Sequence, residues 1–444
     1  MKYLKYSVIV AGIALMAGCG KDNKSPGGTT EPLQPEQSAI YPKPTPAKSS
    51  SETGYTGWVG DVMPYYFNDQ FQIFFLHDAT DQVKQTSKMY ATSTDLKTWT
   101  KKSAFKLTAP AGYSGTDFRD PSVFYNEEFN EYWMMVSTQK SGRAVLLVFT
   151  TKDVAADDWA VRGTLGIDNS NYLMMECAEI FKAGSKYYLL FAEDWSNSPG
   201  TRYRVSNSTA GPWEMPAGGN DMFDGHQFYA GRSVSNGLSR YTMGWAHRRN
   251  PETNAGNLTW GGNLVTHEMY PLSNGDLAVK IPASVAKYFN NETDVKVKNV
   301  AGGATQAGTN FTLTNMGALV RFTAVDKTVM VKGNVSLSQL DGSFNIGFNA
   351  TENSTGTYII KLEPKNNRIA AYSDGQEVTR VPFNFTAGKA YNFQLVMENS
   401  VAVLYMDDKV ALSNRVYNMT NSLWTIGTDG LSATVNNLKV ATHQ

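Results

Sequence analysis

The sequence predicts an all-β protein, a five-bladed β-propeller followed by a C-terminal β-sandwich. From Tyr55 onward no amphipathic helical stretch of useful length occurs, whereas short alternating or aromatic-rich runs recur between turn residues. Hairpin-like units repeat about every 50 to 60 residues, a period typical of propeller blades. After Ile281-Pro282 the chain changes to polar alternating strands, which indicates a second β domain.

The first residues are typical of an exported protein. Lys2 and Lys5 precede an apolar run that ends in Met16-Ala17-Gly18-Cys19, which resembles a bacterial lipoprotein signal with its lipobox. The run is too short to span a bilayer and has the charged start of a secretory peptide. We therefore expect residues 1–19 to be a signal peptide cut before Cys19, whose thiol takes the lipid. The protein would be exported and anchored to the outer membrane by this lipid alone, on the periplasmic or cell-surface side.

Residues 20–53 are rich in Pro, Ser, Thr, Gly and Lys and lack periodic apolar residues, which predicts a flexible linker. Besides Cys19 the chain has one cysteine, Cys177, so an acylated Cys19 leaves no intramolecular disulfide. The hydrophobic core must then stabilise the folded body.

Residues 54–282 contain units in which an extended run meets a polar turn and then an aromatic strand. The units cover residues 63–78, 121–137, 178–193, 233–246 and 261–279. This period fits four-stranded blades better than a single sandwich, in which turns come roughly every 8 to 12 residues. For residues 283–444, with many Asn, Thr and Gly, we expect a sandwich of the jelly-roll, concanavalin-like type.

The composition limits the classes of binding partner that we expect. Lys plus Arg and Asp plus Glu both number 40, and no basic stripe occurs, so there is no electrostatic reason for nucleic acid to bind. The 23 Tyr and 9 Trp offer flat apolar faces that stack on sugar rings, which favours an oligo- or polysaccharide. The five histidines show no HExxH motif or close pair, so neither a catalytic metal nor another cofactor is expected. We expect a monomer.

A carboxylate stands about seven residues before the turn in each of the first three units. These carboxylates are Asp61, Asp120 and Glu176, separated by 59 and 56 residues. Inner strands of a propeller line its central channel, so equivalent positions on successive blades converge. Glycosidic cleavage needs one charged carboxylate to attack or activate water and another that holds a proton for the leaving oxygen. The pattern predicts this chemistry, although any one of these acids alone could instead bond local backbone.

Further residues resemble the invertases, levanases and inulinases, a family that acts on β-fructofuranosides, over roughly residues 57–444. Arg119-Asp120-Pro121 is similar to the family's RDP motif and Glu176-Cys177 to its EC motif, and YATSTDLKTW, QFYAGRS and RYTMGWAHRR are similar to other family segments. The resemblance implies Asp61 as nucleophile, Asp120 as a transition-state stabiliser that bonds sugar hydroxyls, and Glu176 as acid/base. Arg119 would orient the site and balance its charge.

Three functions stay open. The family's Asn-Asp-Pro-Asn-Gly is Gly60-Asp61-Val62-Met63-Pro64 here, and its Glu-Cys-Pro-Asp is Glu176-Cys177-Ala178-Glu179, so the sugar subsite is altered. A retaining hydrolase of levan-, inulin- or sucrose-type bonds is the first candidate. The related arabinanase and xylosidase propellers, which invert configuration on plant polysaccharide, are the second. A catalytically silent glycan-binding lipoprotein is the third, but a binder gains nothing from a raised-pKa acid opposite a charged one.

Several other side chains are predicted to contact substrate by stacking or hydrogen bonding near the blade mouths: Trp58, His77, Arg119, Trp195, His226 and Tyr229. For the aromatic ones, ordinary packing between blades is the alternative. Glu179 is a rival acid, but it lies three residues beyond Glu176 and is expected to project from the opposite strand face.

Overall fold

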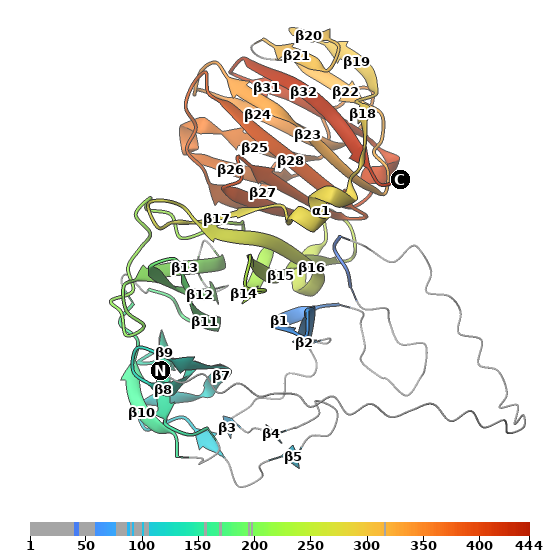
Figure 1. Cartoon of the computed structure of the whole chain (residues 1–444). Coiled ribbons are helices and arrows are strands. Elements are labelled where there is room, and N and C mark those ends of the chain that lie inside the picture. Colours follow the sequence, from blue (N-terminus) through green and yellow to red (C-terminus); the bar gives the residue numbers. More distant parts are fainter. Residues whose placement is uncertain are drawn as a thin grey trace, which may run out of the picture. The chain divides into compact units, whose positions relative to one another are not determined.

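The computed structural model describes residues 40–43, 58–76, 87–88, 91–92, 100–101, 106–154, 158–167, 171–193, 196, 199–314 and 317–444. Their regular secondary structure is almost entirely β-strand (Figure 1). Among them the single α-helix is α1 (Ala283–Tyr288), and no described helix is long and apolar enough to cross a membrane. The predicted signal peptide with Cys19, most of the predicted linker, His77 and Trp195 lie outside the described residues.

Four antiparallel sheets precede α1. Their strands are β1 (Gly60–Phe67), β2 (Gln70–Leu76), β7 (Tyr113–Asn126), β8 (Glu131–Lys140), β9 (Arg143–Thr151), β10 (Ala160–Thr164), β11 (Glu176–Ala183), β12 (Lys186–Glu193), β13 (Gly200–Ser206), β14 (Phe228–Ser235), β15 (Arg240–Asn250), β16 (Asn257–Pro271) and β17 (Leu277–Lys280). The sheets have the orders β1-β2, β10-β9-β8-β7, β11-β12-β13 and β14-β15-β16-β17. Two short pairs also occur, β3 (Ser87–Lys88) with β6 (Leu107–Thr108) and β4 (Ala91–Thr92) with β5 (Thr100–Lys101).

The first strands of these four sheets lie beside one another, because β1 contacts β14, β14 contacts β11 and β11 contacts β7. Large side chains pack between consecutive sheets: Trp133 of β8 and Leu189 of β12 belong to one buried cluster. Adjacent first strands with apolar packing between the sheets are the arrangement of propeller blades.

The predicted number of five blades is not confirmed in the described part of the chain. The unit at 261–279, predicted as the fifth blade, continues the fourth sheet, since β16 pairs with β15 and β17 pairs with β16. The prediction was wrong here because it counted each hairpin as a blade, whereas one four-stranded blade contains two hairpins in succession. The all-β fold, with propeller sheets followed by a sandwich, is confirmed.

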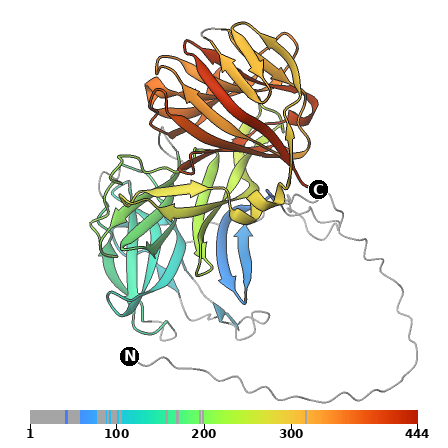
Figure 2. The same ribbon diagram turned by 45° about the horizontal axis from the view of Figure 1, so that its top comes forward.

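Two large sheets follow α1 and pack face to face (Figure 2). Their strands are β18 (Asn291–Asp294), β19 (Val297–Ala301), β20 (Ala304–Ala307), β21 (Asn310–Leu313), β22 (Leu319–Phe322), β23 (Thr328–Leu337), β24 (Ser343–Ala350), β25 (Tyr358–Glu363), β26 (Arg368–Ser373), β27 (Gln376–Pro382), β28 (Ala390–Glu398), β29 (Val401–Met406), β30 (Val410–Arg415), β31 (Leu423–Asp429) and β32 (Ala433–Thr442). One sheet has the order β20-β21-β32-β23-β28-β29-β30, with β18 beside β32, and the other β19-β22-β31-β24-β25-β26-β27. Alternate residues of facing strands, such as Val331 and Ile346, fill the core between them.

Strand β30 joins the sandwich to the fourth propeller sheet through buried polar groups. Arg415 is 2% exposed, and its guanidinium donates to the carbonyl oxygens of Ala246 at 2.8 Å and His247 at 2.9 Å. The carboxylate of Asp224 accepts hydrogen bonds from the backbone N–H of Ser413 at 2.7 Å and its hydroxyl at 2.6 Å. Buried polar groups with several partners each hold this sheet in a fixed position.

Residues 40–43, predicted as part of the linker, are packed against the folded body. Tyr41 is 2% exposed, its backbone N–H donates to Glu398 Oε2 at 2.8 Å, and its carbonyl accepts from Asn263 Nδ2 at 2.8 Å. The linker prediction is wrong for these residues. Composition averaged over the segment hid one aromatic side chain that enters the core.

Candidate active site

A β-bulge recurs in the first strand of each propeller sheet. Pairing is interrupted between Gly60 and Met63, Arg119 and Ser122, Glu176 and Glu179, and Tyr229 and Arg232. The first residue inside each bulge has a left-handed backbone, with φ of 42° at Asp61, 54° at Asp120, 52° at Cys177 and 52° at Ala230. Bulges re-aim side chains, and left-handed backbone at residues other than glycine costs free energy. Its recurrence indicates one functional position in each sheet.

The sequence spacing predicted that the three acids occupy equivalent positions in their strands, and the recurring bulge shows that only two of them do. Asp61 and Asp120 are equivalent, but the equivalent position in β11 is Cys177, and Glu176 stands one residue earlier, where β7 has Arg119. The prediction counted back from residue 183 as a turn residue. Ala183 is still paired in its strand, opposite Lys186, so the count was one residue short.

Glu176 and Asp120 are joined by contacts from three strands. Arg119 donates to Glu176 Oε1 from Nε at 3.1 Å and from Nη2 at 2.8 Å. The hydroxyl of Tyr229 donates to Glu176 Oε2 at 2.5 Å, and the backbone N–H of Cys177 donates to Asp120 Oδ2 at 3.1 Å. The strands β7, β11 and β14 therefore bring these side chains into one cluster.

Asp61 belongs to the same cluster electrostatically. Burial, followed by the negative charges of Asp120 and Glu176, raises the pKa of Asp61 to about 7, while Trp245 and Arg232 oppose the rise. Charges influence one another in this way only at short range. The three predicted acids thus crowd together, and this crowding keeps a proton on Asp61 up to neutral pH.

Opposing influences act on Glu176. Burial raises its pKa above the ordinary value, the hydrogen bond from Tyr229 lowers it, Asp120 raises it and Arg119 lowers it, with a net rise. Burial alone would lower the pKa of Arg119, but Glu176 and Asp117 outweigh burial and raise it. Asp117 accepts a hydrogen bond from Arg119 Nη1 at 2.8 Å. The guanidinium therefore stays charged and binds two carboxylates, those of Asp117 and Glu176.

Two tryptophans that the sequence analysis did not single out lie beside Asp61. A Cβ built on Gly60 would lie 2.1 Å from Cζ2 of Trp260, so the indole ring covers this glycine and excludes any larger residue. Trp245 packs on Trp260 at 5.8 Å between ring centroids and on Tyr229 at 5.4 Å. The tryptophan within RYTMGWAHRR was the available signal for Trp245; nothing nearby in sequence linked Trp260 to Asp61.

Two predicted binding residues, Arg119 and Tyr229, are contacts of Glu176. The ring of His226 lies 5.2 Å from that of His247, which in turn lies 5.6 Å from Tyr229. His226 therefore lies at the margin of the cluster.

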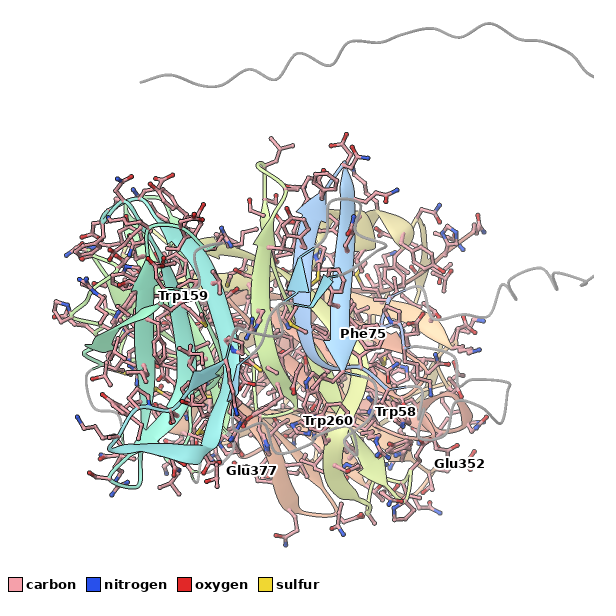
Figure 3. The ribbon with its side chains drawn as sticks, turned by 90° about the horizontal axis from the view of Figure 1, so that it is seen from below. Trp58, Phe75, Trp159, Trp260, Glu352 and Glu377 are labelled. Carbon is pink, nitrogen blue, oxygen red and sulfur yellow. The ribbon has the colours of Figure 1, made fainter. Side chains whose placement is uncertain are left out.

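Trp58 packs inside the protein. It is 8% exposed, and its ring contacts Lys43 Nζ at 4.1 Å and the Arg248 guanidinium at 5.4 Å. Figure 3 shows it beside Trp260, consistent with the approach of its Cβ to Gly261, the residue after Trp260. Packing between strands, the alternative considered for this residue, describes its contacts.

The rival acid Glu179 has a different partner, because its Oε1 accepts from the backbone N–H of Ser233 at 2.6 Å. Cys177 is buried with a free thiol, whose pKa burial raises well above its usual range, so the thiol is not activated. In the part of the chain that the structure describes, no group of three or more His, Cys, Asp or Glu residues could hold a metal ion.

Two family models match the chain in succession: the Glycosyl hydrolases family 32 N-terminal domain over residues 65–268, and the GH32, BT1760-like, C-terminal domain over residues 275–440. The chain belongs to glycosyl hydrolase family 32. The resemblance to invertases, levanases and inulinases is thereby confirmed.

Sucrose-6-phosphate hydrolase of Escherichia coli, a relative, is 27% identical over 182 residues, 38% of this chain and 37% of that protein. This family 32 chain therefore matches little more than a third of the relative's length. Among solved structures, sucrose-6-phosphate hydrolase of Lactobacillus gasseri has a TM-score of 0.61 at 14% identity, with 88% of this chain and 79% of that one covered. Exo-inulinase of Aspergillus awamori has a TM-score of 0.59 at 15% identity, with 80% and 74% covered. At these identities the structural likeness is one of fold.

Proposed function

We propose that this family 32 chain is a β-fructofuranosidase-type glycoside hydrolase that cleaves sucrose-, inulin- or levan-type bonds with retention of configuration. The observation that carries the proposal is the crowding of Asp61, Asp120 and Glu176, with Arg119 bound to Glu176. The names of the relatives, a sucrose-6-phosphate hydrolase and an exo-inulinase, support the substrate class.

In this proposal Asp61 attacks the anomeric carbon and Glu176 protonates the leaving oxygen. Attack requires ionised Asp61, and a pKa of about 7 leaves roughly half of it ionised at neutral pH. Asp120, fixed by the N–H of Cys177, accepts hydrogen bonds from sugar hydroxyls. Water then hydrolyses the glycosyl-enzyme bond while Glu176 removes its proton.

Glu176 must therefore serve in both protonation states, and its surroundings suit both. Burial and Asp120 favour the protonated form that the first step uses. Tyr229 and Arg119 favour the ionised form that the second step uses. This balance distinguishes Glu176 from a simple ion-pair partner of Arg119.

We also propose that the protein is exported and anchored by a lipid on Cys19, which the charged start, the short apolar run and the small residues before Cys19 support. Incorporation of labelled fatty acid should occur in the producing bacterium and disappear in Cys19→Ser. Labelling of that variant to the same extent would contradict the proposal.

The test of activity is hydrolysis of sucrose, inulin, levan, arabinan and arabinoxylan, with the first anomer released followed by NMR. We expect fructose released initially as the β anomer, and Asp61→Asn to reduce turnover about a thousandfold or more while the substrate still binds. Inverted product or pentose release would favour the arabinanase- or xylosidase-type alternative. Binding without turnover in the unaltered chain would identify a glycan-binding protein instead.

A further inference from the structure

A groove of about 280 Å³ lies on the outer face of the eight-stranded sheet of the sandwich, where β23, β28, β29 and β32 run side by side. On β23, Val331 and Val335 enter the core, so Lys332 and Asn334 project from the opposite face. The same alternation puts the side chains of Asn392 and Gln394 on the outer face of β28, because Tyr391, Phe393 and Leu395 enter the core.

Amide side chains form a compact patch in this groove. Asn334 pairs across the strands with Asn392, and Lys332 pairs with Gln394. Across the described ranges no protein group hydrogen-bonds the side-chain amides of Asn334, Asn392 or Gln394. Each amide offers two N–H donors and one carbonyl acceptor, so the patch presents both bonding types at once.

Three charged side chains line the groove, those of Lys332, Asp407 and Asp408, and the first two have charged partners. Lys332 pairs with Glu292, and Asp407 lies 3.3 Å from Lys389 Nζ and 3.7 Å from Lys409 Nζ. Amides are therefore the most numerous bonding groups, beside the carboxylate of Asp408. Such a surface suits a neutral ligand with many hydroxyls, whose O–H groups Asp408 can also accept from, whereas an anion would be repelled.

One wall of the groove is rigid. Tyr405, 2% exposed, lines it next to Gln394, and the Tyr405 hydroxyl is hydrogen-bonded to His267 Nδ1 at 3.0 Å. Since His267 belongs to β16 of the propeller, the groove lies where the sandwich meets the catalytic domain. Its lining shares no residue with the carboxylate cluster.

We propose that this amide groove, lined by Asn334, Asn392, Gln394 and Tyr405, is a second glycan-binding site that holds neutral sugar units of a polysaccharide. Its volume lies just below the usual range of small-molecule pockets, about 300–1,000 Å³, and suits about one sugar ring. The identity of the glycan as fructan rests on the proposed function. A polymer held here would have a raised effective concentration at the carboxylates, whereas a disaccharide would gain nothing.

The test uses the full chain with Asn392→Ala/Gln394→Ala. Its matched control is Asn299→Ala/Gln376→Ala, which removes exposed amides from β19 and β27 of the other sheet. In an Asp61→Asn background, affinity electrophoresis should show levan or inulin bound about tenfold more weakly by the groove variant than by the control. With Asp61 intact, the KM for that polymer should rise about fivefold while kcat/KM for sucrose is unchanged.

Equal affinity of the groove and control variants for both polymers would overturn the inference, as would an equal loss on sucrose and polymer. If the unaltered chain hydrolyses no fructoside but still binds either polymer through the groove, the proposed function fails and the inference stands. Should the double variant unfold, Asn392→Ala alone, at an exposed position, replaces it with Asn299→Ala as control.

Discussion

Two aspartates of this chain, the buried Asp224 and the partly buried Asp61, lie in opposite surroundings. Asp224, at the junction of propeller and sandwich, is 1% exposed. Its carboxylate accepts hydrogen bonds from the backbone N–H of Gly225 at 2.6 Å and from the N–H and hydroxyl of Ser413, and lies 2.9 Å from His267 Nε2. Asp61 faces two other carboxylates, and its pKa is raised to about 7 by burial and by those charges. Burial alone thus does not make a carboxyl group reactive. What decides its reactivity is whether hydrogen-bond donors or other carboxylates surround it.

The two arginines of these regions differ in the same way. Arg415 donates to fixed carbonyl oxygens and to Asn263 Oδ1 at 2.9 Å, which suits a permanent structural role. Arg119 donates to Asp117 and to Glu176, a group that must change protonation during the proposed reaction. Three substitutions test whether the contrast between junction and cluster is real.

The largest effect is expected for Glu176→Gln, which keeps the shape of the side chain but removes its titration. Turnover of sucrose should fall about 10²–10⁴-fold, the usual contribution of a general acid. Glu179→Gln is the matched control, because the glutamine carbonyl oxygen can still accept the hydrogen bond from the Ser233 N–H. Its turnover should fall far less. Steady-state kinetics of both variants measures this, and similar losses would remove the distinction between the two acids.

Arg415→Ala should leave the buried carbonyl oxygens of Ala246 and His247 without their donor. We expect the free energy of unfolding in urea to fall by about 3–5 kcal/mol, because several buried acceptors lose their partner together. Arg380→Ala removes a half-exposed ion pair with Glu377 and should cost less than about 1 kcal/mol. If the two variants unfold at the same urea concentration, the junction is not the structural element inferred here.

The smallest effect is expected for Tyr229→Phe, which removes one hydrogen bond to Glu176. That bond favours the ionised form, so its loss raises the pKa of Glu176 and keeps the acid protonated to higher pH. The alkaline limb of the kcat/KM profile should therefore move to higher pH. Tyr241→Phe, whose ring packs on Phe71 in the first sheet, should leave the profile in place. A shift to lower pH would contradict the role given to Tyr229.

The sequence indicated the acids but not the backbone that aims them. Asp61, Asp120 and Glu176 were recognisable by residue type and spacing, since the same unit recurs. The bulges were not, because a left-handed residue such as Cys177 carries no marker when it is not glycine. Glu176 was consequently placed one position out of phase.

Long-range neighbours also escaped prediction. Trp260 reaches Gly60 from a strand about 200 residues later, and periodicity within a strand says nothing about which strand lies beside it. The sandwich was predictable because alternation along each strand reports one buried face. The number of blades was not, because hairpin counting cannot tell two blades from two halves of one.

The short segment at Tyr41 has a practical consequence for anyone who trims this protein. A chain that begins at residue 54, where the propeller was predicted to start, would deprive Glu398 in the sandwich of the N–H of Tyr41, and Asn263 in the propeller of its carbonyl. It would also empty a core position that a tyrosine ring fills. Shortened forms that retain residue 40 onward should withstand heating better than forms cut at 54, although both contain every carboxylate of the cluster.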